Sequence, residues 1–235
     1  MRTTMTVALA ALSVATALCQ ATFAINPRGT FLRTNQDSPL NPLIVSLTSV
    51  GLVPGQTIKI ETIGDWRAGP QFSDDAYTMI GVFSSSNALL ATSEQHRVPD
   101  AISTCGLSAL SGGTYFGNLP TDIPEDFRIS SHSTQVRQII VRIPHNAAYL
   151  FICVPDSLYN DNTDPDGDLA IRISLDAPLP AGDANCDGCV DDTDLALVLT
   201  AFGQTGSGLA EDFNGDGLVD DSDLAIVLEN FGIGC

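Results

Sequence analysis

The sequence predicts an antiparallel, jelly-roll-like β-sandwich followed by a small all-α unit that contains two loop–helix repeats. Three observations predict this fold class. Short apolar or alternating runs, separated by Gly, Pro, Asn and Asp, continue to residue 176. A short linker with two prolines then follows, and after it an acidic segment occurs twice, each copy leading into an apolar run of helical length. We therefore divide the chain into a leader (1–24), a β-sandwich (25–176), a linker (177–182) and a C-terminal repeat (183–235).

The leader, "MRTTMTVALAALSVATALCQATFA", has the pattern of an export signal. Arg2 precedes an apolar core, and small residues occur near Ala21 and Ala24, where a signal peptidase would cut. The core is shorter than the roughly 20 residues of a spanning helix, and we expect no membrane span. The expected location is therefore secreted, extracellular or at the cell surface, where disulfides persist.

Five segments of the middle region are expected to form strands, because they are rich in Val, Ile, Thr and aromatic residues and lack a helical period. They are 55–66, 76–93, 136–144, 147–156 and 168–176. Turn residues separate them, as in an antiparallel sandwich.

The charge balance excludes one class of partner. The chain has 10 Lys and Arg against 28 Asp and Glu, a net charge of −18, so it lacks the basic surface that nucleic acids require. The imbalance is greatest over residues 183–235, where 12 acidic residues occur without a Lys or Arg. Divalent cations are the expected partners of such a segment.

The acidic repeats have the ligand spacing of a calcium-binding EF-hand loop. The second copy begins 29 residues after the first, and both place oxygen-bearing residues at positions 1, 3, 5, 9 and 12, with Gly at position 6 and a carbonyl ligand at position 7. The first loop has Asp183, Asn185, Asp187, Gly188, the carbonyl of Cys189, Asp191 and Asp194; the second has Asp212, Asn214, Asp216, Gly217, the carbonyl of Leu218, Asp220 and Asp223. Carboxylate and amide oxygens suit the hard calcium ion, so we expect two bound Ca²⁺.

A loop followed by one helix, repeated twice and ending in Asp at position 12, resembles a type I dockerin. The resemblance covers residues 183–235 and implies calcium-dependent folding, pseudo-twofold symmetry and binding to a cohesin domain of a scaffold or surface protein. In that family positions 10 and 11 contact the cohesin, which here are Asp192–Thr193 and Asp221–Ser222. An Asp at position 10 departs from the common pairs and leaves the partner's identity open.

We also expect the residues that are apolar in both helices to form a shared core: Leu195, Leu197, Val198, Leu199 and Phe202, with Leu224, Ile226, Val227, Leu228 and Phe231.

Five cysteines follow the leader, and their number leaves at least one unpaired within the chain. They are Cys105, Cys153, Cys186, Cys189 and Cys235. The twofold symmetry of the repeat would return Cys235 toward the first loop, so a bridge to Cys186 or to Cys189 is expected. A zinc site at Cys186-x-x-Cys189 is the alternative, although no second Cys or His pair accompanies it.

The segment "FICVPDSLYNDNTDPDGDLAIRI" (151–173) offers a third cation site. Together with "PGQTIKIETIGDW" it resembles the PA-IL-type calcium-dependent galactose lectins and related bacterial exported domains, which are galactose-binding β-sandwiches. The resemblance implies a calcium held by Asp156, Asp161 and Asn162, with carbonyls near Leu158 and Ala68, and bound to carbohydrate hydroxyls. The spacing between Asp156 and Asp161 is shorter than in the lectins, and "TDPD" (163–166) is extra. The alternative is an acidic surface hairpin without a metal.

No catalytic constellation is recognisable in the sequence. Glu125 and Asp126 are adjacent and would point in opposite directions on a strand, whereas glycosidase carboxylates face each other across a cleft. The three histidines have no companion motif, and Trp66 is expected in the core. We therefore expect a secreted calcium-binding dockerin protein that docks a lectin-like, carbohydrate-binding sandwich onto a cohesin-bearing assembly. The alternatives are a dockerin-borne glycan-degrading enzyme of polysaccharide catabolism and a purely structural surface component.

Overall fold

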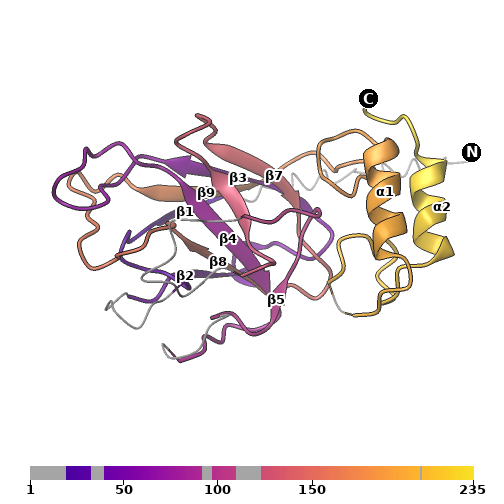
Figure 1. Ribbon diagram of the computed structural model, residues 1–235, viewed down its shortest axis with the longest axis horizontal. Helices are drawn as coiled ribbons and strands as arrows, with labels where there is room; N and C mark the ends of the chain where they lie inside the picture. The colour runs from indigo at the N-terminus through magenta and orange to yellow at the C-terminus, as the bar shows by residue number, and fades with distance from the viewer. Residues whose placement is uncertain (1–19, 33–39, 92–96, 110–122, 207) are drawn as a thin grey trace, which may run out of the picture.

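The computed structural model of the chain describes residues 20–32, 40–91, 97–109, 123–206 and 208–235 (Figure 1). Most of the expected leader, residues 1–19, lies outside the described residues. Its last five residues, Gln20–Ala24, form strand β1, which pairs along its whole length with strand β9 (Ala170–Leu175).

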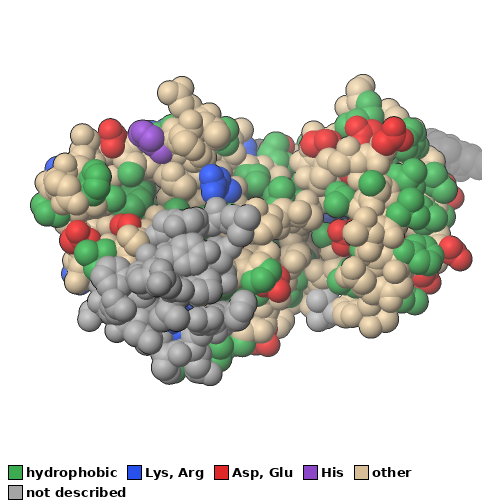
Figure 2. Space-filling view, in the orientation of Figure 1, with side chains coloured by type: hydrophobic (Ala, Val, Ile, Leu, Met, Phe, Trp, Pro, Cys, Tyr) green, Lys and Arg blue, Asp and Glu red, His purple; other side chains and the backbone are tan. Residues whose placement is uncertain are grey.

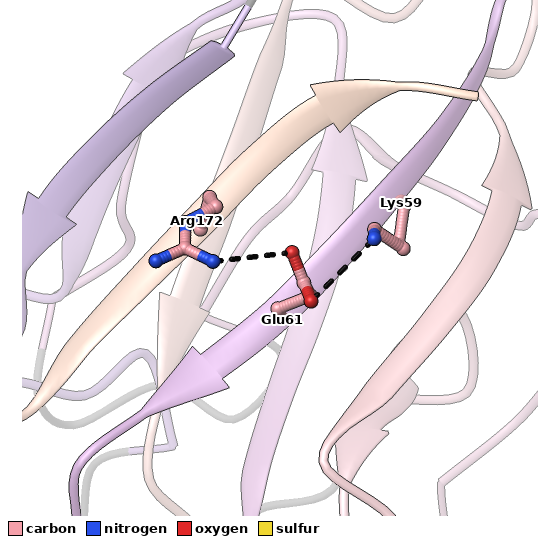
Figure 3. Close-up of polar contacts among 3 residues, drawn as sticks. All are labelled: Lys59, Glu61 and Arg172. Atoms are coloured by element: carbon pink, nitrogen blue, oxygen red, sulfur yellow. Dashed lines mark ion pairs between the residues drawn. The ribbon is translucent and has the colours of Figure 1, made fainter.

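The first sheet has four antiparallel strands in the order β1-β9-β3-β7. Its two remaining strands are β3 (Thr57–Ile63) and β7 (Gln138–Arg142), which pair from Thr57 opposite Arg142 to Glu61 opposite Gln138. Along β3 the side chains alternate, so that Ile58 and Ile60 are fully buried while Lys59 and Glu61 face outward. On that outer face Glu61 lies 3.5 Å from Lys59 and 3.7 Å from Arg172 of β9 (Figure 3). Such half-exposed ion pairs add about 0–1 kcal/mol to stability.

The second sheet is also antiparallel, with strands in the order β2-β8-β4-β5 and a further strand, β6, beside β4. They are β2 (Leu43–Ser46), β4 (Met79–Ser84), β5 (Ala101–Ile102), β6 (Phe127–Ser130) and β8 (Tyr149–Cys153), with a short 3₁₀ helix, η1 (Thr48–Val50), after β2. Each of the five segments expected to be strands contains one. β1, β2, β5 and β6 were not expected.

The main core lies between the two sheets and contains side chains from both. Ile58, Ile60 and Ile171 come from the first sheet, and Phe83 and Phe127 from the second. β4 is buried on both faces, because its outward residues Ile80 and Val82 join a second apolar cluster under the loops that cover this sheet. This double burial explains why β4 reads as a continuous apolar run in the sequence rather than as an alternating one.

A buried chain of hydroxyl groups connects the two sheets. Thr62 of β3 donates to Ser130 of β6 over 2.7 Å, and the Ser130 hydroxyl donates to the carbonyl of Tyr77. Both hydroxyl residues are buried, so water does not replace a lost partner.

We expect Ser130→Ala to lower the free energy of unfolding by about 2 kcal/mol, since it leaves the Thr62 hydroxyl and the Tyr77 carbonyl unpaired inside the core. Urea unfolding followed by fluorescence measures the change. Ser133→Ala is the matched control, because Ser133 is exposed and water can replace its hydroxyl beside that of Ser131. Equal effects of the two substitutions would contradict a structural role for the buried chain.

The second part of the expected fold class, an all-α unit at residues 183–235, is wrong. The described chain is mostly two antiparallel sheets, and residues 183–235 contain only two short helices, α1 (Asp192–Ala201) and α2 (Asp221–Glu229), set among loops (Figure 1). The helices are short because each begins only after the turns of an acidic loop and ends near a glycine, Gly203 or Gly232, that has a positive φ. An all-α unit does not form.

The C-terminal repeat is attached to the sandwich by more than the linker. A disulfide joins Cys105, after β5, to Cys186 in the first acidic loop. Within the linker, the backbone N–H of Leu179 donates to the Thr57 side chain and the carbonyl of Pro180 accepts from the Arg142 guanidinium. The repeat therefore packs at one end of the sandwich, with α1 and α2 side by side (Figure 1).

The expected core of the two helices is smaller than the sequence suggested. Val198, Val227 and the two position-8 valines, Val190 and Val219, are fully buried, with Ala201 beside them. Four residues expected in this core are instead about half exposed: Leu199, Phe202, Leu228 and Phe231. Helices of 10 and 9 residues that pack only on each other and on the loops have one buried face, so the opposite apolar face meets solvent.

Candidate metal centres

The first acidic loop is organised by its own carboxylates, which accept hydrogen bonds from the loop backbone. Asp183 at position 1 accepts from the N–H of Gly188, and Asp194 at position 12 accepts from the N–H groups of Ala184, Asn185 and Asp191. Asp191 is the N-cap of α1, and with Asp194 it forms a capping box. The ends of the loop and the start of the helix are thereby held together by the residues expected to bind a cation.

The second loop repeats this pattern. Asp223 accepts from Phe213, Asn214 and Asp220, and Asp220 forms the capping box at the start of α2. In both loops the position-3 asparagine and position-5 aspartate bond each other, Asn185 with Asp187 and Asn214 with Asp216. Gly188 and Gly217 have φ values of 92° and 89°, which explains the glycine required at position 6.

The position-8 valines interlock the two halves of the repeat. Val190 of the first loop pairs with the backbone that follows α2, through Gly232 and Ile233, over 2.8 and 3.0 Å. Val219 of the second loop pairs in the same way with Gly203 and Gln204 after α1. Each loop is thus braced by the chain that leaves the other helix, so the two halves of the repeat make reciprocal contacts.

The two loops differ at position 1. Asp183 is fully buried, and its Oδ1 has no hydrogen-bond partner. Asp212 is also buried, but its Oδ1 accepts from Gly215 and Asp216 and its Oδ2 from Gly217. Burial raises the pKa of Asp183, and hydrogen bonding from Gly188 opposes this shift. A buried carboxylate oxygen without a partner, in a loop that carries further carboxylate and amide side chains, has the chemistry of a Ca²⁺ ligand.

Arg142 at the end of β7 lies between the sandwich and the loops. Its guanidinium donates to the Pro180 carbonyl and lies 5.7 Å from the ring of Phe213, at position 2 of the second loop. Burial lowers the pKa of Arg142, and the charges of Asp183 and Asp194 oppose this shift. The side chain lines a cavity of about 500 Å³ between the two parts of the chain, together with His145, Asp212 and Glu229.

The expected third site is assembled from two distant segments. Residues 66–70 and 156–163 meet at paired backbone hydrogen bonds between Arg67 and Thr163, of 2.8 and 3.0 Å. The Asp161 carboxylate lies against Gly69, where an added Cβ would be only 2.8 Å from its Oδ2. Burial raises the pKa of Asp156, and hydrogen bonds from Ser157 and Asn162 oppose the rise. The juxtaposition that the lectin resemblance implies is therefore present.

Asn162 carries the most informative atom of this third site. The residue is fully buried, and its Nδ2 donates to the Pro27 carbonyl over 3.0 Å. Its Oδ1 is buried without a hydrogen-bond partner. A buried amide oxygen without a partner has the chemistry of a cation ligand, and the Asn162 side chain also hydrogen-bonds Asp156.

Sequence reasoning missed one acidic cluster. Among the described His, Cys, Asp and Glu residues, only Asp164, Asp166 and Asp168 have ligand atoms that all lie within 4.8 Å of one another. The loop carboxylates do not form such a close group. Burial, followed by the charge of Asp168, raises the pKa of the neighbouring Asp65. The triad lies in "TDPDGD", of which "TDPD" (163–166) is extra relative to the lectins, and its alternating Asp residues are a visible acidic signal.

The residues expected to contact a partner lie on the surface. Asp192, Thr193, Asp221 and Ser222 are all exposed in the first turns of α1 and α2. Five of the nine large apolar side chains that are exposed in the described chain also lie in this region: Leu199, Phe202, Leu228, Phe231 and Ile233. Acidic and apolar groups alternate over this end of the molecule (Figure 2).

The disulfides exclude the zinc site that the sequence offered as an alternative at Cys186 and Cys189. Cys186 and Cys189 are both in disulfides, the first with Cys105 and the second with Cys235, so a zinc site at this pair is not formed. The Cys189–Cys235 bridge is one of the two pairings expected for Cys235, whereas the Cys105–Cys186 bridge was not expected. Cys153 is buried and free, and burial raises the pKa of its thiol to about 12.

The side chains considered for catalysis do not come together. Asp126 is buried and accepts from the N–H of Ala109, whereas Glu125 is half-buried beside it. His132 stacks near Tyr77 and its Nδ1 lies 3.0 Å from the Asp75 carbonyl, while His145 packs on Gly215. His96 lies outside the described residues. Trp66 is in the core, as expected.

Comparisons with protein-family models, with curated proteins and with solved structures found no match to this chain. In the part of the chain that the structure describes, no helix has the length and apolar character needed to cross a membrane.

Proposed function

We propose that this chain is an exported calcium-binding protein, in which the C-terminal repeat docks a lectin-like β-sandwich onto a cohesin-bearing scaffold or surface protein. The observation that carries the proposal is the repeated acidic loop. Two segments 29 residues apart make the same hydrogen bonds at positions 3, 5 and 12, and one of them contains a buried carboxylate oxygen, Asp183 Oδ1, without a partner. A solvated acidic linker would have neither the conserved internal geometry nor the buried oxygen.

The ligands in this proposal are the residues at positions 1, 3, 5, 7, 9 and 12 of each loop. Ca²⁺ bound there would neutralise carboxylates that otherwise repel one another and would stabilise the turns that lead into α1 and α2. The chain's own contribution is to hold the oxygens in place through the capping boxes and the position-6 glycines.

Docking is supported by the surface of the repeat. Leu199 and Leu228 are equivalent residues in the two halves, and both are more than half exposed. They lie on the same helices as the exposed pairs Asp192–Thr193 and Asp221–Ser222. An apolar surface with acidic residues around it suits a partner face that has apolar pockets and basic residues at its rim.

Carbohydrate binding by the sandwich is supported by the third site. Asn162 Oδ1, Asp156 and Asp161 offer oxygens for one Ca²⁺, and in this proposal the ion contacts sugar hydroxyl groups directly. A glycan array probed with the intact protein, with calcium and with chelator, tests this part. Calcium-dependent retention on any glycan supports it, and equal signals under both conditions contradict it.

The whole proposal is tested by calcium titration calorimetry of the intact chain, for which we expect three bound ions. Asn162→Ala is expected to reduce the number bound to two, because it removes a buried ligand that no neighbouring group replaces. Asn160→Ala, an exposed neighbour on the same loop, is the matched control and should leave three. Two ions in the wild type would contradict the sandwich site, and none would contradict the proposed function.

A further inference from the structure

Both disulfides of the described chain end in the first acidic loop. Cys186 is at position 4 and is bonded to Cys105 of the sandwich, and Cys189 is at position 7 and is bonded to Cys235 near the end of the chain. Position 7 contributes a carbonyl ligand, so the second bridge is attached to a residue of the cation site itself. The first loop is thus covalently held on both sides of its turn.

The second loop has no covalent anchor at the equivalent positions. Position 4 is Gly215, which packs on the ring of His145, and position 7 is Leu218, which forms an isolated bridge with Thr205. The counterpart of the Cys189–Cys235 bridge is a single backbone hydrogen bond of 3.0 Å from Gly206 to Gly217. The two loops therefore have nearly the same sequence, but only the first is held by disulfides.

The anchoring coincides with the difference at position 1. Cys186 is held at a φ of 59° and its N–H does not bond Asp183, whose Oδ1 stays unpaired in a fully buried position. In the second loop, the N–H groups of Gly215 and Asp216 turn inward onto Asp212 Oδ1. A cation entering the second loop must replace two hydrogen bonds, whereas a cation entering the first must replace none at this oxygen.

From these contacts we infer that the two disulfides preorganise the first loop as the tighter of two unequal calcium sites, with the Cys105–Cys186 bridge coupling its occupancy to the sandwich. The inference rests on the proposed calcium function and adds an order of filling and a role for the cysteines. Ligands held in the bound geometry lose less conformational freedom on binding, which is why the anchored loop is favoured. The positive charge of Arg142, which interacts with those of Asp183 and Asp194, repels a cation and so opposes this preference. The expected preference is the net of the two effects.

The test is a calcium titration of the intact, ¹⁵N-labelled protein followed by NMR. The amide resonances of Gly188 and Gly217 report the two loops separately, because each position-6 N–H donates to the position-1 carboxylate of its own loop. We expect the Gly188 midpoint at a calcium concentration about tenfold below that of Gly217. In the Cys105→Ser, Cys186→Ser variant the Gly188 midpoint should rise about tenfold, while the Gly217 midpoint moves less than twofold.

Cys153→Ala is the matched control, because it removes a thiol that takes part in neither bridge, and it should move neither midpoint. If the double serine variant does not fold, the reciprocal effect is measured on the wild type. Linkage requires calcium to shift the Cys105–Cys186 dithiol–disulfide equilibrium toward the disulfide by the same factor, about tenfold, in a dithiothreitol redox buffer.

The outcomes separate this inference from the proposed function. If calcium moved neither glycine resonance, the proposed calcium sites would be wrong and the inference with them. If both resonances moved with equal midpoints, and calcium left the disulfide equilibrium unchanged, the inference would be overturned while the calcium sites stood. A lower midpoint for Gly217 would overturn it as well, since Arg142 would then outweigh the disulfides.

Discussion

Replacing Asp183 and Asp212 together by alanine is expected to remove the part of the calcium-dependent rise in thermal stability that the two acidic loops contribute. Each residue occupies position 1 of its loop and is buried, so its carboxylate is the ligand that water can least replace. At a calcium concentration about 100 times the dissociation constant, each site adds about 2.7 kcal/mol to the free energy of unfolding. Loss of both sites therefore removes about 5 kcal/mol, which corresponds to roughly 10–20 °C in the melting temperature.

The measurement is differential scanning calorimetry of the wild type and the double variant, each with calcium and with chelator. The difference between the two conditions isolates the cation effect, because alanine also removes hydrogen bonds that the loops make without it: one to Asp183 and three to Asp212. Asp75→Ala with Glu229→Ala is the matched control, since both are exposed and lie outside the loops, and the change in net charge is the same. An undiminished calcium response in the loop variant, or a reduced one in the control, would contradict the assignment of ligands.

The two repeated acidic loops were recognisable in the sequence because each is a local structure. Its oxygens, its glycine and its capping residues lie within 12 consecutive positions, and the second copy repeats them. The strands of the sandwich were readable for a similar reason, since alternation along β3 reflects one buried and one exposed face. The continuous apolar run of β4 also predicted a strand, and it is continuous because both faces of β4 are buried.

What the sequence could not show depends on contacts between distant residues. The Cys105–Cys186 bridge joins residues 81 positions apart, and nothing near Cys105 marks it as a partner of the acidic loop. The all-α C-terminal unit was a wrong prediction because apolar residues in a short helix need not be buried. Leu199 and Leu228 follow the helical pattern but meet solvent, since the two helices bury only one face each. β1 was missed because an export signal and a strand are both apolar.

The strongest effect on docking is expected from Leu199→Asp combined with Leu228→Asp. Both side chains are more than half exposed, so acidic replacements leave the core of the repeat, at Val198 and Val227, intact. In a complex they would be buried, and placing two carboxylates against an apolar partner surface costs both the lost apolar contact and the desolvation of charge. We expect the affinity for a cohesin that binds the wild type to fall more than 100-fold.

The experiment is surface plasmon resonance of the wild type and the variants on a panel of cohesin domains, in calcium. Because Leu199 and Leu228 are equivalent residues of the two halves, each single substitution leaves one intact face and should reduce affinity by less than about fivefold. Val53→Asp with Phe72→Asp is the matched control, since it makes the same change at exposed apolar residues of the sandwich. A double variant that bound like the wild type would remove this face from the docking proposal, and a wild type that bound no cohesin would refute docking altogether. A full loss in Leu199→Asp alone would instead show that only the disulfide-anchored half meets the partner, which makes the bridges of the first loop a determinant of orientation as well as of cation affinity.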